Sequence, residues 1–268
     1  MGSMILSAEY YCQPVLKTTH YHDCHQIIYV ESGSARVFVD GRRFEAPAGS
    51  VLIFSRFEHH AVTANSDDYR RYVLEIASGM PETDGKNYQI YSILFNRPQG
   101  FTNMVDISGC SEEIREILND ILNEQKNENL FQPEMMNLLL LQLLIRICRK
   151  LPDTLPEWNE TTSEMVRRLQ QRLETGFGQE LSLTELAKEY GMSVSYLSHQ
   201  FKNITGNSVM GYLISCRLAA AKKRLAETNM SIGEIVETCG FSDNSNFSRI
   251  FKKQVGCSPT QFRNRYRD

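Results

Sequence analysis

Two stretches near the end of the chain, about fifty residues apart, place small, polar or basic side chains between apolar ones at helical spacing. Side chains of these types can bind DNA: arginine forks onto guanine, and asparagine pairs with adenine through two hydrogen bonds. Lysine adds affinity for phosphates without carrying sequence information. The first stretch offers Ser195, Ser198, His199 and Lys202, and the second offers Asn244, Ser245, Asn246, Arg249, Lys252 and Lys253.

The elements that must position these side chains are also repeated. Ser182, Glu185 and Gly191 match Ser231, Glu234 and Gly240 at a spacing of 49. In each copy the serine suits the start of a short helix, and the glycine suits the left-handed turn that ends it. A second helix follows, which buries its apolar positions and exposes its polar ones. This pattern predicts a helix-turn-helix, although a single copy would be weak support because helical hairpins are common.

The segment between the copies, residues 208–229, predicts one long helix with an apolar face and a basic face. The basic face would carry Arg217, Lys222, Lys223 and Arg224. A helix of some 20 residues is about 30 Å long, and one turn of B-DNA spans about 34 Å. Such a rod can hold two recognition helices in successive major grooves, which explains why the unit occurs twice.

The sequence from Ile204 to Arg263, beginning ITGNSVMGYLISCRLAAAKKRL and ending FSRIFKKQVGCSPTQFR, closely resembles the DNA-binding domain of the AraC/XylS family of bacterial transcription regulators. The resemblance covers about 100 residues and departs from the family pattern at Val236-Glu237. It implies base contacts from Ser195, Ser198, His199, Asn244, Ser245, Asn246 and Arg249, and phosphate contacts from Lys202, Lys252 and Lys253. Three alternatives stay open: Arg249 as a phosphate clamp, His199 as a solvated helix residue and Ser195 as a helix cap.

The first hundred residues predict many short strands separated by Gly and Pro, which is typical of an all-β sandwich or barrel. Asp40-Gly41 suits a two-residue hairpin turn, and the apolar segments NYQIYSILF (residues 87–95) and RRYVLEI (residues 70–76) are both expected to be strands. Helical periodicity follows in residues 111–127 and 133–150. The second of these helices is apolar on most sides, so it is either a core helix or a subunit interface.

A polar group near the predicted strands comprises His20, His22, Gln26 and His60. Together with the strand pattern it resembles the cupin-like barrel that often precedes this DNA-binding domain. Metal-binding cupins have a glutamate where this chain has Gln26, and a neutral amide is a poor ligand for most transition metals. We therefore expect no catalytic metal and no cofactor. The histidines and Gln26 are expected to line a pocket for a small-molecule effector, since barrel mouths are common ligand sites. The alternative is a barrel that only supports dimerisation.

Charge is distributed unevenly along the chain, whose net charge is −3. Residues 161–268 carry 15 Lys and Arg against 10 Asp and Glu, whereas residues 1–160 carry 14 against 22. Only the C-terminal part is therefore expected to meet a polyanion. The seven cysteines have no C-x-x-C spacing, and no segment resembles a signal peptide or a membrane span. These features indicate reduced thiols and a cytoplasmic location.

The combined prediction is a two-domain protein. Residues 1–107 form a cupin-like sensor domain, residues 108–151 a helical dimerisation segment, residues 152–162 a linker, and residues 163–268 an all-α domain with two helix-turn-helix units. The predicted function is sequence-specific transcription regulation by a homodimer that binds promoter DNA and an effector, and contacts RNA polymerase if it activates. The alternatives are a cupin-type metalloenzyme fused to a DNA-binding domain and an architectural DNA protein. No nucleophile elbow, phosphate loop or H-E-x-x-H motif supports an enzyme.

Overall fold

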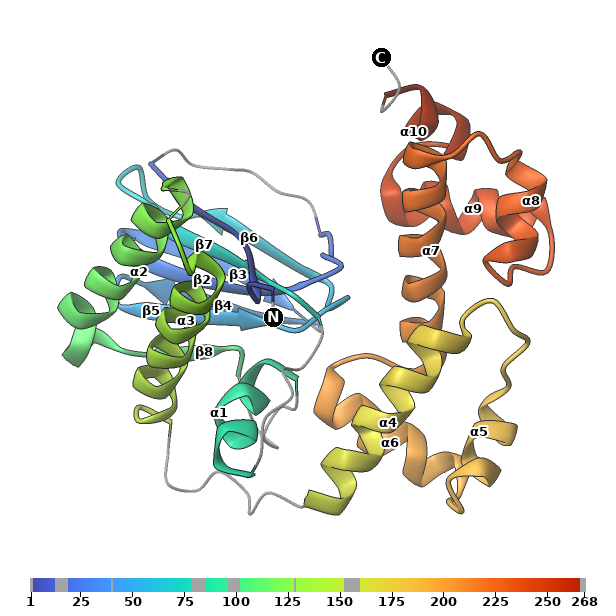
Figure 1. The fold of residues 1–268 in the computed structure, drawn as a ribbon, viewed down its shortest axis with the longest axis horizontal. Helices are drawn as coiled ribbons and strands as arrows, with labels where there is room; N and C mark the ends of the chain where they lie inside the picture. The colour runs from blue at the N-terminus through green and yellow to red at the C-terminus, as the bar shows by residue number, and fades with distance from the viewer. Residues whose placement is uncertain are drawn as a thin grey trace. The chain divides into compact units, whose positions relative to one another are not determined.

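The computed structural model describes residues 2–12, 19–39, 41–78, 85–95, 102–127, 129–151 and 160–265. The chain divides between Asn159 and Glu160 into two compact units (Figure 1), the first built on β-sheets and the second entirely helical. The predicted division into a β-sheet N-terminal part and an all-α C-terminal part is therefore confirmed. Within the described ranges, no helix is both long enough and apolar enough to cross a membrane.

Two antiparallel sheets form the first unit. The larger has the order β1-β7-β2-β5-β8 and the smaller has the order β4-β3-β6. The strands are β1 (Ile5–Tyr11), β2 (His25–Ser32), β3 (Ser34–Val39), β4 (Arg42–Pro47), β5 (Ser50–Phe54), β6 (His60–Ala64), β7 (Arg70–Ile76) and β8 (Met104–Asp106). Val39 pairs with Arg42 across the β3–β4 turn, which confirms the two-residue hairpin, and Gly41 adopts a φ of +76°. Asp40 lies outside the described residues.

Side chains of the larger sheet alternate between two different interiors, as the period of two in a strand requires. One face packs against the helices through Ile27, Tyr29, Val51, Ile53, Tyr72, Leu74 and Ile76. The other face meets the smaller sheet through Ile28, Val30, Leu52 and Phe54, which pack with Val37, Val39 and Val62. The enclosed face toward the smaller sheet is the one that can hold a pocket.

The expectation of a strand at residues 87–95 is wrong, because this segment belongs to helix α1 (Gly85–Phe95). Its side chains from Tyr91 to Phe95 are buried in the core between the helices and the larger sheet. A short, almost continuous apolar run suits a buried strand and a buried helix equally well. Packing against helix α3, which lies far along the sequence, decides between them.

Helices α2 (Ser111–Lys126) and α3 (Gln132–Cys148) match the two predicted helices and cover the larger sheet (Figure 1), after a short 3-10 helix η1 (Ser108–Cys110). The α3 helix buries Met136, Leu139, Leu140, Leu143, Leu144 and Ile147. Much of its apolar surface is therefore core of this chain. A second apolar stripe, formed by Phe131, Met135 and Leu138, stays exposed at 67%, 46% and 61%.

Within residues 160–265 the second unit contains seven helices. They are α4 (Glu160–Gly176), α5 (Leu183–Glu189), α6 (Val194–Thr205), α7 (Val209–Glu227), α8 (Ile232–Thr238), α9 (Asn244–Val255) and α10 (Pro259–Arg265). The α5–α6 and α8–α9 pairs lie at opposite ends of α7 (Figure 1). Residues 152–159 of the predicted linker lie outside the described residues, and its last three residues already belong to α4.

Candidate nucleic-acid interface and barrel pocket

Both helix-turn-helix copies begin with the same capping box. The Ser182 hydroxyl accepts a hydrogen bond from the backbone N–H of Glu185, and Ser231 does the same for Glu234. Each glutamate in turn accepts from the backbone N–H of its serine, so two helix-end donors are satisfied in each copy. These bonds lower the pKa of the Glu234 carboxyl. Both predicted caps are thus confirmed.

Glycines in the left-handed conformation end α5 and α8, as predicted. Gly191 has a φ of +64° and Gly240 a φ of +76°. The chain then turns into α6 and α9, which we call the recognition helices. They bury Leu197 and Phe201 in the first copy and the equivalent Phe247 and Phe251 in the second, all at 0% exposure. This apolar anchor fixes which face of each recognition helix points outward.

The ten side chains predicted to touch DNA all lie on that outward face or at its edge. Ser195, His199, Lys202, Asn244, Ser245, Arg249, Lys252 and Lys253 are exposed, and Ser198 and Asn246 are half-buried. None of them belongs to the apolar core, so the helices leave them accessible to a ligand. Val194 and Tyr196 at the start of α6 are also exposed, at 39% and 45%. The sequence prediction assigned no role to these two residues.

Hydrogen bonds hold the polar face of α9 in order. Asp243 caps the helix by accepting from the backbone N–H of Asn246 at 2.7 Å. Arg249 Nη2 donates to Asn246 Oδ1 at 2.9 Å. The guanidinium is therefore positioned on the surface before any ligand binds. In α6 the corresponding cap is Ser193, whose hydroxyl accepts from the N–H of Tyr196 at 3.2 Å.

One arginine of α7 links the two copies. Arg217 donates from Nε to the carbonyl oxygen of Phe177 at 2.8 Å and from Nη2 to that of Gln179 at 2.9 Å, both just before α5. A Cβ on Gly240, in the turn of the second copy, would lie 2.6 Å from the same Phe177 oxygen and 3.1 Å from the Arg217 guanidinium. Burial lowers the pKa of Arg217. The predicted basic face is therefore wrong at this position, since Arg217 ties backbone segments together.

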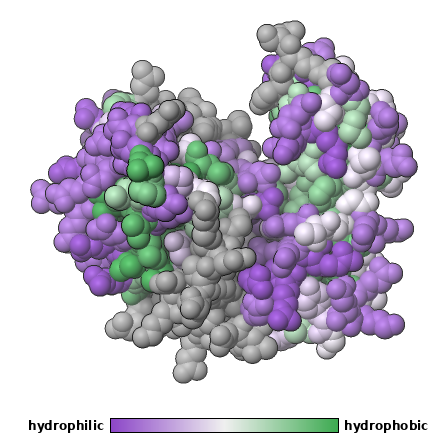
Figure 2. All heavy atoms as spheres, in the orientation of Figure 1, coloured by the Kyte–Doolittle hydropathy of each residue, from purple (hydrophilic) through white to green (hydrophobic). Residues whose placement is uncertain are grey.

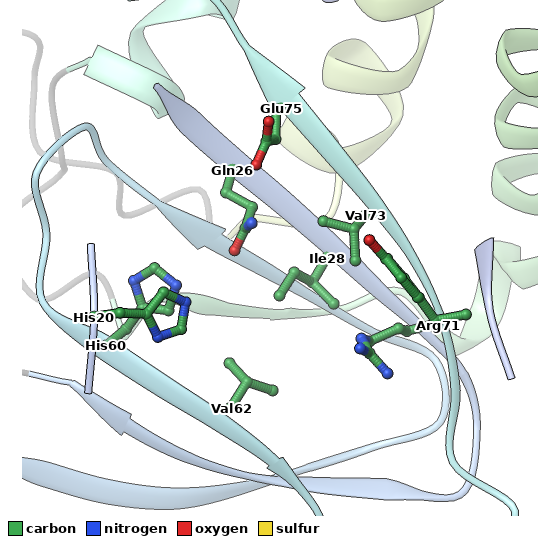
Figure 3. A pocket seen from close by; sticks show the side chains of 9 residues that line it. His20, Gln26, Ile28, His60, Val62, Arg71, Val73 and Glu75 are labelled. Carbon is green, nitrogen blue, oxygen red and sulfur yellow. The ribbon is translucent and has the colours of Figure 1, made fainter. Parts of the chain in front are cut away.

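The space between the two sheets, which we call the barrel interior, contains a polar pocket of about 60 Å³. Figure 3 shows His20 and His60 at one side of it and Arg71 at the other. Its lining consists of Tyr11, His20, Gln26, Ile28, His60, Val62, Arg71, Val73 and Glu75. Small-molecule sites typically measure about 300–1,000 Å³, so a larger effector would enter only if these side chains moved.

Three of the four residues predicted for an effector pocket line it, and the fourth, His22, lies beside them. The His22 ring is centred 4.9 Å from that of His20 and 5.5 Å from that of His60. Gln26 Nε2 lies 3.4 Å from His22 Nε2. The residues therefore come together in space, although 38 positions separate His22 from His60 in the sequence.

The sequence prediction missed the polar residues of β7 in this pocket. Arg71, which is 6% exposed, and Glu75 alternate with Val73 on the barrel face, while Tyr72 and Leu74 face the helices. Glu75 pairs directly with Gln26 across the β2–β7 ladder. The Arg71 guanidinium lies 4.6 Å from the centre of the Tyr11 ring. Two charged residues four positions apart, which places them on the same face of an otherwise apolar strand, were the available signal.

Two family models match the chain. Residues 3–144 match the AraC-like ligand binding domain, and residues 186–265 match a helix-turn-helix domain. The first covers more than half of the sequence and the second contains both recognition helices. The chain belongs to the AraC family of transcription regulators. It is a DNA-binding regulator with an N-terminal effector domain, as the sequence predicts.

Relatives of this AraC-family regulator match over most of its length. The HTH-type transcriptional activator RhaS of Escherichia fergusonii is 24% identical over 255 residues, which cover 91% of this chain and 86% of the relative. The activator RhaR of Mannheimia succiniciproducens is 25% identical, covering 92% and 87%. Among solved structures, ToxT from Vibrio cholerae matches with a TM-score of 0.60 at 13% identity, covering 96% of this chain and 97% of ToxT. That similarity concerns the fold. A form of ToxT with an unsaturated fatty acid bound matches with a TM-score of 0.59.

Proposed function

We propose that this regulator is a sequence-specific activator that binds promoter DNA through α6 and α9 and responds to a small molecule in the barrel pocket. The observation that carries the proposal is the pair of recognition helices, each with its polar face exposed, at opposite ends of a single 19-residue helix. Activation rather than repression is supported by the RhaS and RhaR relatives. As an activator, the protein would also contact RNA polymerase. Because bacterial promoter DNA lies in the cytoplasm, we propose that the protein acts there.

Each recognition helix has a division of roles in this proposal. Ser195, Ser198 and His199 contact bases in one major groove, and Asn244, Ser245, Asn246 and Arg249 contact bases in the next. Lys202, Lys252 and Lys253 bind phosphates. The lysines are charged and exposed, which suits the salt-dependent part of affinity. The hydrogen bond from Arg249 to Asn246 supports a direct role for α9, because a side chain that is already ordered loses less entropy on binding.

Selection of bound sequences from a random duplex pool tests this function. We expect one enriched site with two half-sites about one helical turn apart. Affinity for the selected duplex should exceed that for random duplex by about 10³-fold or more at physiological salt. Equal affinity for both duplexes would contradict sequence-specific regulation and favour a protein that only coats DNA.

The exposed stripe on α3 is proposed as the homodimer surface, within the helical segment 108–151. Met135 and Leu138, three positions apart, lie on one exposed face of the helix, and exposed Phe131 precedes the helix as its N-cap. Figure 2 shows apolar surface gathered over this helix. A second copy of the chain would cover it. Leu138→Arg should dissociate the dimer in sedimentation experiments, whereas Asp67→Arg, at an exposed position between β6 and β7, should leave it intact.

The effector is proposed to be a small molecule with an acidic group, bound within residues 1–107. Buried Arg71 offers a guanidinium suited to a carboxylate, and His20, His22, Gln26 and His60 offer further polar contacts. ToxT, which has a similar fold, binds a fatty acid. We propose binding rather than catalysis at this pocket. A screen of small carboxylic acids should raise the melting temperature of the full chain, since a ligand stabilises the folded state that it binds, and Arg71→Gln should abolish the increase.

A further inference from the structure

Three histidines converge at one end of the barrel pocket. One ring nitrogen from each of His20, His22 and His60 lies within 4.8 Å of the others. The ring centres of His20 and His60 are 4.7 Å apart. The backbones of these two residues exchange a pair of hydrogen bonds, each 2.9 Å long, so the segment before β2 is held against the start of β6. The cluster is thus fixed by main-chain pairing and does not depend on side-chain contacts alone.

The hydrogen bonds around two of the three rings indicate which nitrogen carries the proton. His60 Nδ1 lies 2.9 Å from the carbonyl oxygen of Glu58. A carbonyl only accepts, so Nδ1 carries the proton and Nε2 keeps its lone pair. His60 is also locked in place by stacking on Phe54, with ring centres 3.9 Å apart and planes at 7°.

His22 shows the same arrangement. Its Nδ1 lies 3.5 Å from Glu75 Oε1, and a carboxylate can only accept from it. The Nε2 atom then keeps a lone pair, which agrees with its position 3.4 Å from the Gln26 amide nitrogen. Metal-binding histidines nearly always donate their second ring N–H to a carbonyl or a carboxylate, which orients the ring and raises its basicity. Two of the three rings are therefore already supported as metal ligands are.

We propose that His20, His22 and His60 bind a divalent transition metal of the zinc type. Three imidazoles with an open fourth position are an established donor set for Zn²⁺. Two Zn–N bonds of about 2.1 Å span at most about 4.2 Å, so nitrogens within 4.8 Å need only small rotations to close on one ion. The pocket of about 60 Å³ supplies room for the ion and a small fourth ligand.

Gln26 does not need to be a ligand in this site. Its amide contacts His22 Nε2 and would give way to the metal, while the three imidazoles supply the donors. The presence of Gln where metal-binding cupins have Glu therefore does not decide the question. A metal here would join the segment before β2 to β6 and stabilise the folded barrel. The inference concerns binding alone and adds no reaction.

Calorimetric titration of the full chain with Zn²⁺, after removal of metals by EDTA, tests the proposal. We expect one ion per chain and a rise in melting temperature with Zn²⁺. Bound Co²⁺ should show the intense visible absorption of four-coordinate cobalt. His20→Gln and His22→Gln should each weaken binding by more than about 100-fold, and Glu75→Gln by about 10- to 100-fold. These substitutions spare buried His60, whose replacement would endanger the fold.

His59→Gln is the matched control, because His59 is exposed and adjacent to His60 but outside the cluster. It should bind Zn²⁺ like the unmodified chain. Cys24→Ser tests a second possible donor group, formed by His22, Cys24 and Glu75. The proposal is overturned if the chain binds no stoichiometric metal, if His20→Gln binds like His59→Gln, or if Cys24→Ser alone abolishes binding. The titration contains neither DNA nor effector, so its outcome is independent of the proposed regulatory function.

Discussion

The turn of the first helix-turn-helix copy has open space around Gly191, whereas the turn of the second is pressed against Phe177 and Arg217. Both copies share the capping box, the left-handed glycine and two buried anchor residues in the recognition helix. What differs is the surroundings of the turn. The repeated local sequence therefore specifies two similar hairpins, and contacts from outside the repeat give the second one a further task, which is to hold the segment before the first copy.

Alanine at the two glycines should produce the largest contrast between the copies. Gly191→Ala carries only the cost of the left-handed conformation, about 1–2 kcal/mol, because nothing lies within 4 Å of the added Cβ. Gly240→Ala adds overlap with a backbone oxygen at 2.6 Å, so we expect a loss of about 3 kcal/mol or more. Urea unfolding followed by circular dichroism measures both losses.

A control substitution within the second copy shows whether the loss of stability is specific to the glycine of the turn. Gly233 lies in α8, where an added Cβ meets nothing closer than 3.9 Å. Gly233→Ala should be neutral or stabilising by about 0.5–1 kcal/mol. If Gly191→Ala and Gly240→Ala were equally destabilising, the contact between the second turn and Phe177 would have no energetic weight.

Removal of the link from α7 should have the next largest effect. Arg217→Ala leaves the carbonyls of Phe177 and Gln179 without their charged donor, and a hydrogen bond to a charged group contributes about 1.5–3 kcal/mol. We expect a loss of about 2 kcal/mol in the same unfolding experiment. Lys223→Ala, on the exposed part of α7, should change stability by less than about 0.5 kcal/mol. An equal loss of stability in the two variants would mean that Arg217 is an ordinary surface residue of the basic face.

Local signals explain how much of the DNA-binding unit the sequence could predict. Serine caps, left-handed glycines and the spacing of Leu197 and Phe201 act within a few residues, so the helices and turns follow from them. The role of Arg217 depends on carbonyls some 40 residues away, and no local pattern reports it. The same limit applies to α1, whose apolar run fits a strand until its packing against α3 is known.

The pocket shows a similar division. His20, His22 and His60 could be grouped through the cupin resemblance. Arg71 and Glu75 share one face of β7 because four positions separate them, but no local pattern says that this face is enclosed by a second sheet. A charged residue in a strand is usually solvated at an edge, but β7 lies between β1 and β2 in the larger sheet. Arg71 and Glu75 line a pocket because the smaller sheet covers the face of β7 on which they lie.

The recognition helices should differ in their contribution to DNA binding. Arg249→Ala removes a charged, two-pronged donor that is already ordered by Asn246, so affinity should fall by about 1–3 kcal/mol and discrimination should relax at one base pair. His199→Ala should cost less, about 1 kcal/mol or below, since a single hydrogen bond contributes about that much. Fluorescence anisotropy on the selected duplex and its single-base variants measures both.

Lys253→Ala serves as the comparison for a residue that binds phosphate. It should weaken binding to all duplexes alike and reduce the slope of log affinity against log salt by about 1. A loss at Arg249→Ala that was uniform across duplexes would make Arg249 a phosphate clamp. A larger loss of affinity at His199→Ala than at Arg249→Ala would mean that α6 contributes more to DNA binding than α9.

The smallest expected difference between the two copies concerns the N-cap residues of the recognition helices. The cap of α9, Asp243, is a carboxyl that titrates in acid, whereas the cap of α6, Ser193, is a hydroxyl. Backbone hydrogen bonds, chiefly from Asn246, hold the pKa of Asp243 below its usual value of 3.8. A carboxyl with a lowered folded-state pKa stabilises the fold above pH 3.8, and this contribution disappears as the pH falls through the folded-state pKa. The stability difference between the unmodified chain and Asp243→Asn should therefore shrink as the pH falls below about 4. The cap of α6, Ser193, has no group that titrates in this range, so the difference for Ser193→Ala should stay constant. Parallel curves for the two variants in acid unfolding would mean that the charge of Asp243 contributes nothing to its cap.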